Sequence, residues 1–304
     1  MVTSPIDLEA LSSKEFEKFF DSFDHVFSDC DGVIWSITPL PRTGEFFKLA
    51  KSLGKTLHFV SNNSLRSREN YKNLFDATGI ENGVENLTYP SIAISEYLKS
   101  VNFDKHVYSV SCQQTNMMME SYGIKCKVGP DVGADYYADY IKYLADDPEI
   151  GAVVFDSDFK VNLPKLYKAI TYLKRPEVLF INGASDKMVP LMKGCLALGT
   201  GVFTDIVEKE TKRTPVLLGK PGKMFGEFAM KRAGVTDPAR ILFIGDMIEQ
   251  DVGLGKASGF KTLLVLTNSS KEQMLSNTKV SPDFYARSLG DLVPLVEKLV
   301  SEKL

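Results

Sequence analysis

Short apolar runs alternate with amphipathic segments along most of the chain. The runs at 23–28 and 55–63 have the length of buried strands, and the segment 43–55 between them carries apolar residues at helical spacing. We predict that Thr43 is the N-cap of this helix and that Gly54 marks its C-terminal end. Strands that alternate with helices in this way predict an α/β protein with a mainly parallel sheet.

Several of the predicted strands share a polar or glycine-rich carboxyl end. This pattern follows the apolar runs within 23–28, 55–63, 214–222 and 239–251, and it fades in 261–270. The carboxyl ends of parallel strands lie on one edge of a sheet. We therefore predict that residues far apart in the sequence build one site at this edge.

The middle of the chain has a different character. From about 100 to 212 there is a second set of strand and helix patterns, which lacks the acidic strand ends. We predict that 100–212 forms a separate α/β domain, inserted into a discontinuous domain that consists of 1–99 and 213–304.

Composition and charge limit the classes of function. The 304 residues are 44% hydrophobic and 25% charged, with a net charge of −3. No long basic run and no apolar run of about 18–20 residues is present, so neither nucleic acid nor a membrane is an expected partner. The first twenty residues lack the apolar core of a signal peptide. The four cysteines form no CxxC pair, and together these features predict a reduced, cytoplasmic protein.

The polar strand ends carry a set of residues with a recognisable chemistry. They are Asp29, Asp31, Ser61, Asn62, Asn63, Lys220, Asp246 and Asp251. A cluster of carboxylates favours Mg²⁺, and a lysine with a serine hydroxyl suits the oxygens of a phosphate. One carboxylate can attack phosphorus, and a neighbouring protonated one can supply the proton of the leaving group. In an extended backbone, Asp29 and Asp31 face the same side, about 6–7 Å apart, so both can address one phosphate.

Four segments, in order, resemble the four motifs of the haloacid dehalogenase superfamily of phosphatases. They are DCDGVIW (29–35), FVSNNS (59–64), LLGKP (217–221) and GDMIEQD (245–251). The insertion between the second and third motifs resembles the large α/β cap of one subclass. The sequence is especially similar to the eukaryotic phosphoglycolate phosphatase and pyridoxal phosphatase branch. The resemblance implies a Rossmann-like core with an inserted cap, and a Mg²⁺-dependent hydrolase of small phosphorylated substrates.

The resemblance also implies a role for each motif residue. Asp29 would be the nucleophile and a Mg²⁺ ligand. Asp31 would be the general acid and base, and its backbone carbonyl would be a further ligand of the metal. Asp246 would complete the protein ligands. Gly32 would permit the tight loop after Asp31. Asp251 would orient Lys220 or a metal-bound water. The residues that would bind phosphate or substrate are Ser61, Asn62, Asn63 and Lys220.

Substrate specificity is expected in the cap. The segment 182–186 resembles a region that ends in an aspartate near the active-site entrance of relatives, which makes Asp186 a candidate for substrate contact. Val189 stands where the pyridoxal phosphatase type tends to carry a histidine, so the pattern favours a phosphoglycolate-like substrate. Relatives often dimerise through the cap, and the tyrosine-rich segment 136–143 would either serve a homodimer or pack within the cap.

Alternatives stay open at this stage. The same core could act on phosphoserine or phosphotyrosine in proteins, and a DxD motif after a strand also occurs in metal-dependent glycosyltransferases. For single residues, Asp251 could cap the following helix, and 61–63 could form a turn. Trp35 is expected to pack in the core rather than to contact substrate.

Overall fold

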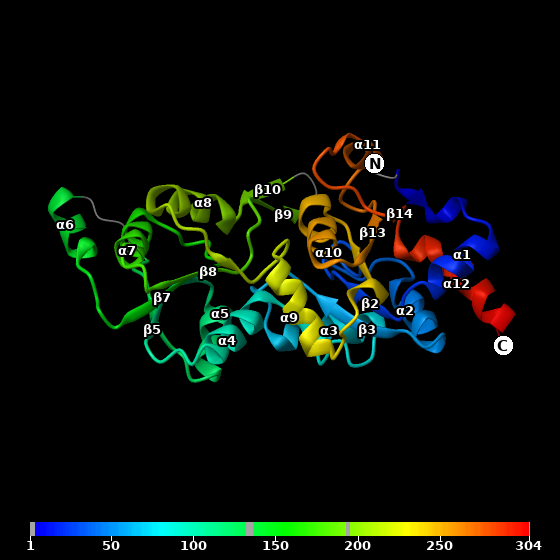
Figure 1. Ribbon diagram of the computed structural model, residues 1–304, viewed down its shortest axis with the longest axis horizontal. Coiled ribbons are helices and arrows are strands. Elements are labelled where there is room, and N and C mark those ends of the chain that lie inside the picture. The colour runs from blue at the N-terminus through cyan, green and yellow to red at the C-terminus, as the bar shows by residue number, and fades with distance from the viewer. Residues whose placement is uncertain (1–3, 132–135, 193–194, 304) are drawn as a thin grey trace. The chain divides into compact units, whose positions relative to one another are not determined.

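The computed structural model describes residues 4–131, 136–192 and 195–303. The chain separates into two compact units (Figure 1). The first unit comprises 1–61, 67–88 and 221–304, and the second comprises 62–66 and 89–220. The sequence pattern predicts boundaries at 99/100 and 212/213. The units change at 88/89 and 220/221 instead, because α4 (Pro90–Ser100) packs against α5 (Gln113–Ser121) and β11 (Val216–Leu217) pairs within the second unit.

The first unit contains a seven-stranded sheet in the order β1-β14-β13-β12-β2-β3-β4, and every pair of neighbours is parallel. Its strands are β1 (Ile6–Asp7), β2 (His25–Ser28), β3 (Thr56–Val60), β4 (Leu87–Thr88), β12 (Ile241–Gly245), β13 (Lys261–Val265) and β14 (Phe284–Ala286). All five residues of β12 are buried, as expected when helices cover both faces of a parallel sheet. The prediction of a mainly parallel α/β core is confirmed.

Helices precede or follow these strands in the first unit. They are α1 (Ser13–Asp21), α2 (Thr43–Ser52), α3 (Arg68–Thr78), α9 (Lys223–Ala233), α10 (Gly253–Ser258), α11 (Lys271–Ser276) and α12 (Leu289–Lys303), with short 3₁₀ turns at Leu8–Ala10 and Pro238–Arg240. Helix α2 packs on α12, which also contacts α1, and α9 packs on α10. Phe243 of β12 stacks on Phe260, which also contacts Phe27 of β2, so aromatic side chains fill the space under the central strands.

The predicted ends of helix α2 are partly right. Gly54 follows the helix with a left-handed φ of 81°, the backbone conformation that glycine adopts without strain. Thr43 is not the N-cap, because Arg42 holds that position with a φ of 59°. The buried Thr43 hydroxyl instead donates to the carbonyl oxygens of Ile34 and Leu40 and so fixes the loop before the helix.

The second unit contains its own five-stranded parallel sheet in the order β11-β8-β7-β5-β6. Besides α4, α5 and β11, its elements are β5 (His106–Ser111), β6 (Lys125–Val128), β7 (Ile150–Asp156), β8 (Leu179–Asn182), α6 (Tyr137–Ile141), a 3₁₀ turn (Lys142–Leu144), α7 (Leu163–Leu173) and α8 (Thr200–Thr211). Strand β9 (Met188–Met192) pairs antiparallel with β10 (Cys195–Leu198).

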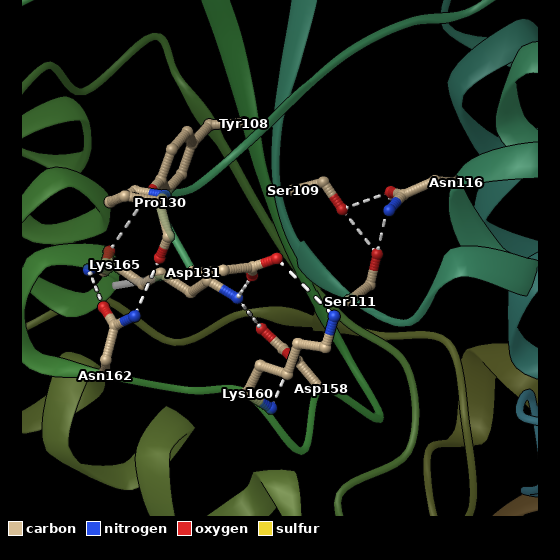
Figure 2. A network of polar contacts seen from close by, with 10 residues as sticks. All are labelled: Tyr108, Ser109, Ser111, Asn116, Pro130, Asp131, Asp158, Lys160, Asn162 and Lys165. Atoms are coloured by element: carbon tan, nitrogen blue, oxygen red, sulfur yellow. Dashed lines mark hydrogen bonds and ion pairs between the residues drawn. The ribbon is translucent and has the colours of Figure 1, made fainter. Parts of the chain in front are cut away.

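A buried lysine organises one end of this second sheet. Lys165, 2% exposed, pairs through Nζ with Asp158 at 2.7 Å and with Asp131 at 3.1 Å, as Figure 2 shows. The hydroxyl of Tyr108 donates to the Lys165 carbonyl at 3.2 Å. Because a buried charge is tolerated only with paired partners, this network ties helix α7 to the loops after β6 and β7.

Among the described helices, none is both long enough and apolar enough to cross a lipid bilayer.

Candidate active site

Three carboxylates meet at the carboxyl edge of the first sheet. Asp29 follows β2, and Asp246 and Asp251 follow β12. Each offers an oxygen atom, and these atoms all lie within 4.8 Å of one another. The three residues are buried, at 6%, 1% and 1% exposure. Like charges held this closely and out of water favour a bound cation.

Strand pairing explains why these residues meet. Strands β2 and β12 are neighbours, with Ser28 opposite Ile244, and the Asp29 N–H donates to the Ile244 carbonyl at 2.8 Å. From β2 the chain proceeds to β3 and β4 on one side, whereas β12, β13 and β14 lie on the other. This reversal of strand order is the point at which open α/β sheets bind ligands.

Asp251 stabilises the loop behind Asp246. Its Oδ2 atom accepts the backbone N–H groups of Asp246 at 3.1 Å and of Met247 at 2.9 Å, across the π-helical turn Ile248–Val252. The alternative that Asp251 caps the following helix is wrong. The N-cap of α10 is Val252, which makes no side-chain capping bond, because the Asp251 carboxylate is directed at the preceding loop.

The loop after β2 turns sharply at Gly32. This residue has a φ of 84°, and its N–H donates to the Trp35 carbonyl at 2.6 Å. A Cβ atom at Gly32 would overlap with Oδ2 of Asp246, so only glycine fits here. Asp31 is half-buried in the same loop. Trp35 is fully buried against Phe75, with the ring centroids 4.9 Å apart, which confirms the prediction that it packs in the core.

Sequence reasoning missed three residues around this cluster. Thr267 donates from its hydroxyl to the Gly32 carbonyl at 2.5 Å. Asn268 donates to Oδ2 of Asp246 at 2.5 Å, and Ser269 donates to the Asp246 carbonyl at 2.6 Å. The prediction that the polar pattern fades after β13 is therefore wrong. The signal was the run of four polar residues at 267–270, which begins two residues after the end of β13.

Ser61 also lies in the first unit, directly after β3. It is 1% exposed, its N–H donates to the Thr88 carbonyl at 3.0 Å, and its hydroxyl accepts a hydrogen bond from Tyr71 at 3.1 Å. Tyr71 was not predicted to contact the site. Its contact with Ser61 depends on how α3 packs against the sheet.

The other predicted residues lie in the second unit. Lys220 follows β11, which pairs with β8 through Val216 and Ile181. The prediction that Lys220 follows a strand of the same sheet as Asp29 is therefore wrong. Because β11 has only two residues, its hydrophobic pattern is too short to predict which sheet it joins. In the structure it pairs with β8, a strand of the second unit.

Asn62, Asp186 and Lys220 meet within the second unit. The Asn62 Nδ2 atom donates to Oδ2 of Asp186 at 2.8 Å and to the Lys220 carbonyl at 3.3 Å, and its Oδ1 atom accepts the Lys220 N–H at 2.7 Å. Asn63 accepts the N–H of Leu65 at 3.0 Å, as in an Asx turn. The alternative interpretation, that 61–63 form a turn, therefore agrees with this contact of Asn63.

The sequence matches known families and proteins. Residues 26–125 match the family described as haloacid dehalogenase-like hydrolase, and residues 217–292 match a second family of HAD-like hydrolases. The chain is 31% identical to phosphoglycolate phosphatase 2 of Arabidopsis thaliana, over 95% of this chain and 98% of that protein. It is 30% identical to glycerol-3-phosphate phosphatase of Rattus norvegicus, over 94% and 95%.

A solved structure shows the same architecture. The p-nitrophenyl phosphatase of Archaeoglobus fulgidus matches with a TM-score of 0.75 and 28% identity, over 90% of this chain and 99% of that one. These matches exclude the glycosyltransferase alternative. The chain therefore belongs to the haloacid dehalogenase-like hydrolases, within their branch of phosphoric monoester hydrolases, and it combines a Rossmann-like core with an inserted α/β cap.

Proposed function

We propose that this protein is a Mg²⁺-dependent phosphatase of a small phosphorylated metabolite, which acts through an aspartyl phosphate formed on Asp29. The observation that carries the proposal is the buried cluster of Asp29, Asp246 and Asp251, whose carboxylate oxygens lie within 4.8 Å of one another. Such a cluster is costly unless a cation compensates its charge, and carboxylate oxygens are ligands of the kind that Mg²⁺ prefers.

The ligands of the cation would be the carboxylates of Asp29 and Asp246 and the backbone carbonyl of Asp31. When bound, the cation would neutralise negative charge on the phosphoryl oxygens. Asp251 would act indirectly, because its Oδ2 atom already accepts two backbone N–H groups of the Asp246 loop.

The reaction would proceed in two steps. In the first, a carboxylate oxygen of Asp29 forms a bond to phosphorus, the ester P–O bond breaks, and Asp31 gives its proton to the departing oxygen. In the second, a water attacks phosphorus and gives a proton to Asp31. The bond between Asp29 and phosphorus then breaks, so inorganic phosphate is released and the Asp29 carboxylate is restored. Ser61 and Lys220 would hold the transferring phosphoryl group in both steps.

For the substrate, we favour a small phosphoglycolate-like ester. The named relatives include a phosphoglycolate phosphatase and a glycerol-3-phosphate phosphatase. Val189 offers only an aliphatic side chain where a ring-contacting histidine would favour pyridoxal phosphate. Phosphoglycolate, glycerol phosphate, pyridoxal phosphate and phosphopeptides should be compared by kcat/KM. A phosphopeptide as the best substrate would establish the protein-phosphatase alternative.

The central test uses 4-nitrophenyl phosphate. We expect turnover that requires Mg²⁺ and disappears in Asp29→Asn. Asp76→Asn is a suitable control, since Asp76 is an exposed aspartate that pairs with Lys72 on α3. Metal-independent turnover, or full activity of Asp29→Asn, would refute the proposed mechanism.

We further propose a cytoplasmic homodimer. Among the described residues, Cys30, Cys112 and Cys126 are in no disulfide bond, which supports a reducing compartment. Two exposed apolar side chains of the second unit, Tyr136 at 74% and Ile141 at 60%, could lie in a dimer interface. Light scattering on the native protein and on Ile141→Asp tests this, and a monomeric native protein would refute the dimer.

A further inference from the structure

The backbone of Lys220 is held from both sides by one side chain. Asn62 accepts the Lys220 N–H through Oδ1 at 2.7 Å and donates to the Lys220 carbonyl through Nδ2 at 3.3 Å. The primary amide thus pairs with the N–H and C=O of one residue, as a neighbouring strand would. The two residues are 158 positions apart in sequence, so this pairing is a product of the tertiary fold.

The contacts of Asn62 account for both N–H groups of its side-chain amide. An asparagine amide has two N–H groups. In Asn62, one is directed at the Asp186 carboxylate at 2.8 Å and the other at the Lys220 carbonyl. While these bonds are made, the side-chain amide of Asn62 has no N–H left for a phosphate oxygen.

A second side chain contacts the same peptide. The hydroxyl of Ser185 donates to the Lys220 carbonyl at 2.9 Å. The preceding residue, Gly219, lies so close to the segment 183–186 that a Cβ atom at Gly219 would overlap with the carbonyl oxygen of Gly183. The backbone at 219–220 is therefore packed and hydrogen-bonded against the segment 183–186.

The segment 183–186 is itself anchored to the second sheet. Asp156, at the end of β7, accepts the Ala184 N–H at 3.1 Å and the Thr115 hydroxyl at 2.7 Å. On the other side, the N–H of Gly201 donates to the Asp186 carbonyl at 3.1 Å. A segment fixed at both ends can hold a neighbouring peptide in place.

We propose that Asn62 and Ser185, with Asp186 orienting Asn62, are positioning residues that hold the Lys220 backbone. This inference rests on the proposed function, in which Lys220 binds the transferring phosphoryl group. Lysine has a flexible four-carbon side chain, so fixing its Cα limits where the ammonium group can reach. Asn62 then acts through Lys220 rather than on phosphate, and the segment 183–186 serves the phosphoryl group common to all substrates.

Ser185→Ala provides the first test. Loss of the hydrogen bond should lower kcat/KM by about 3- to 10-fold. The factor should be the same for 4-nitrophenyl phosphate and glycerol phosphate, because both carry the same phosphoryl group. Inorganic phosphate, which has no leaving group, should bind more weakly by a similar factor in the presence of Mg²⁺. Ser185→Thr keeps the hydroxyl and should retain most of the activity.

Ser22→Ala is the matched control. Ser22 also donates to a backbone carbonyl, that of Phe19 at 2.7 Å, but it lies at the end of α1. Its substitution should leave both kcat/KM values unchanged. If Ser185→Ala affects the two substrates unequally, or leaves the affinity for inorganic phosphate unchanged, the segment acts on the leaving group and the inference is overturned.

The combination of Asn62→Ala with Ser185→Ala tests whether the two residues act through one peptide. If they do, the double variant loses less activity than the product of the single losses. If the loss of activity in the double variant equals the product of the two single losses, Asn62 binds phosphate independently of Ser185, and the proposal is wrong. Should Asn62→Ala fail to fold, the Ser185 variants decide alone. Failure of the proposed function is separate, since it would appear as absent Mg²⁺-dependent turnover in the native protein.

Discussion

Asp251 accepts the backbone N–H of Asp246 through its Oδ2 atom, at a distance of 3.1 Å. The same oxygen accepts the N–H of Met247 at 2.9 Å. One carboxylate thus belongs to the acidic cluster and also fixes the loop that carries another member of it. This dual use explains why an acid is placed five residues after Asp246.

The two roles of Asp251 can be separated by substitution. Asp251→Ala leaves the buried Asp246 N–H without its acceptor, which should cost about 1–3 kcal/mol of unfolding free energy. Asp251→Asn keeps an acceptor oxygen and should cost less, while it removes a negative charge from the cluster. We expect both variants to need more Mg²⁺ for half-maximal activity. Urea unfolding and Mg²⁺ titration measure the two effects. Equal stability of the two variants would contradict the loop-fixing role.

Gly32 should resist substitution for two reasons that a control can separate. Gly32→Ala places a Cβ against Asp246 in a residue with a φ of 84°. Gly79, at the end of α3, has a similar φ of 71°, but the space beside it is open, with no atom within 4 Å of the position that a Cβ would take. Gly79→Ala should therefore lose only about 1–2 kcal/mol from backbone strain and keep its Mg²⁺ requirement.

For Gly32→Ala, we expect a larger loss of stability together with at least a tenfold higher Mg²⁺ requirement, because the clash displaces a proposed ligand. Thermal unfolding with and without Mg²⁺ gives a readout that does not depend on turnover, since a ligand stabilises the folded state that binds it. An equal Mg²⁺ requirement in both glycine variants would show that Gly32 does not shape the metal site.

His58 should make the protein less stable in acid. Burial lowers the pKa of its imidazole from 6.5 to about 4, with a smaller effect of the charge on His25. The unfolded chain binds a proton near pH 6.5 and the folded chain only near pH 4. The unfolded state therefore gains protons as the pH falls through this window, and stability falls with it.

The contribution of His58 should reach at most about 2 kcal/mol, because the ring is only partly buried and solvent screens its charge. His58→Phe keeps a ring beside Phe27, whose centroid lies 5.1 Å from that of His58, and removes the titrating group. Thermal unfolding between pH 7 and pH 4 should show a shallower loss of stability in the variant. Parallel curves for the two proteins would rule out His58 as a source of acid sensitivity.

Trp35 is the only tryptophan of the chain and is fully buried next to the Asp31 loop. Its Nε1–H has no hydrogen-bond partner among the described residues. Trp35→Ala should cost about 3–5 kcal/mol from the cavity it leaves. Trp35→Phe should cost much less, because an aromatic ring still meets Phe75 and the unpaired N–H is gone. Urea unfolding followed by circular dichroism compares the variants, and equal losses would contradict this account.

The local sequence by itself determined the strand–helix alternation and the residues at the strand ends. Asp29 and Asp246 follow apolar runs long enough to be buried strands, and the carboxyl ends of parallel strands share an edge. Their meeting could thus be predicted without coordinates. The tight loop at Gly32 was expected from the resemblance of 29–35 to a family motif, and its φ of 84° is a conformation that glycine tolerates.

Only the tertiary structure decided which distant groups became partners. The pattern at 214–222 predicts a strand, but hydrogen bonding to β8 assigned β11, and with it Lys220, to the second sheet. The bonds of Asn268 to Asp246 and of Asn62 to Lys220 likewise join residues 22 and 158 positions apart. Local periodicity reports which side of an element is buried. Which neighbour lies against it depends on long-range packing, which no local pattern contains.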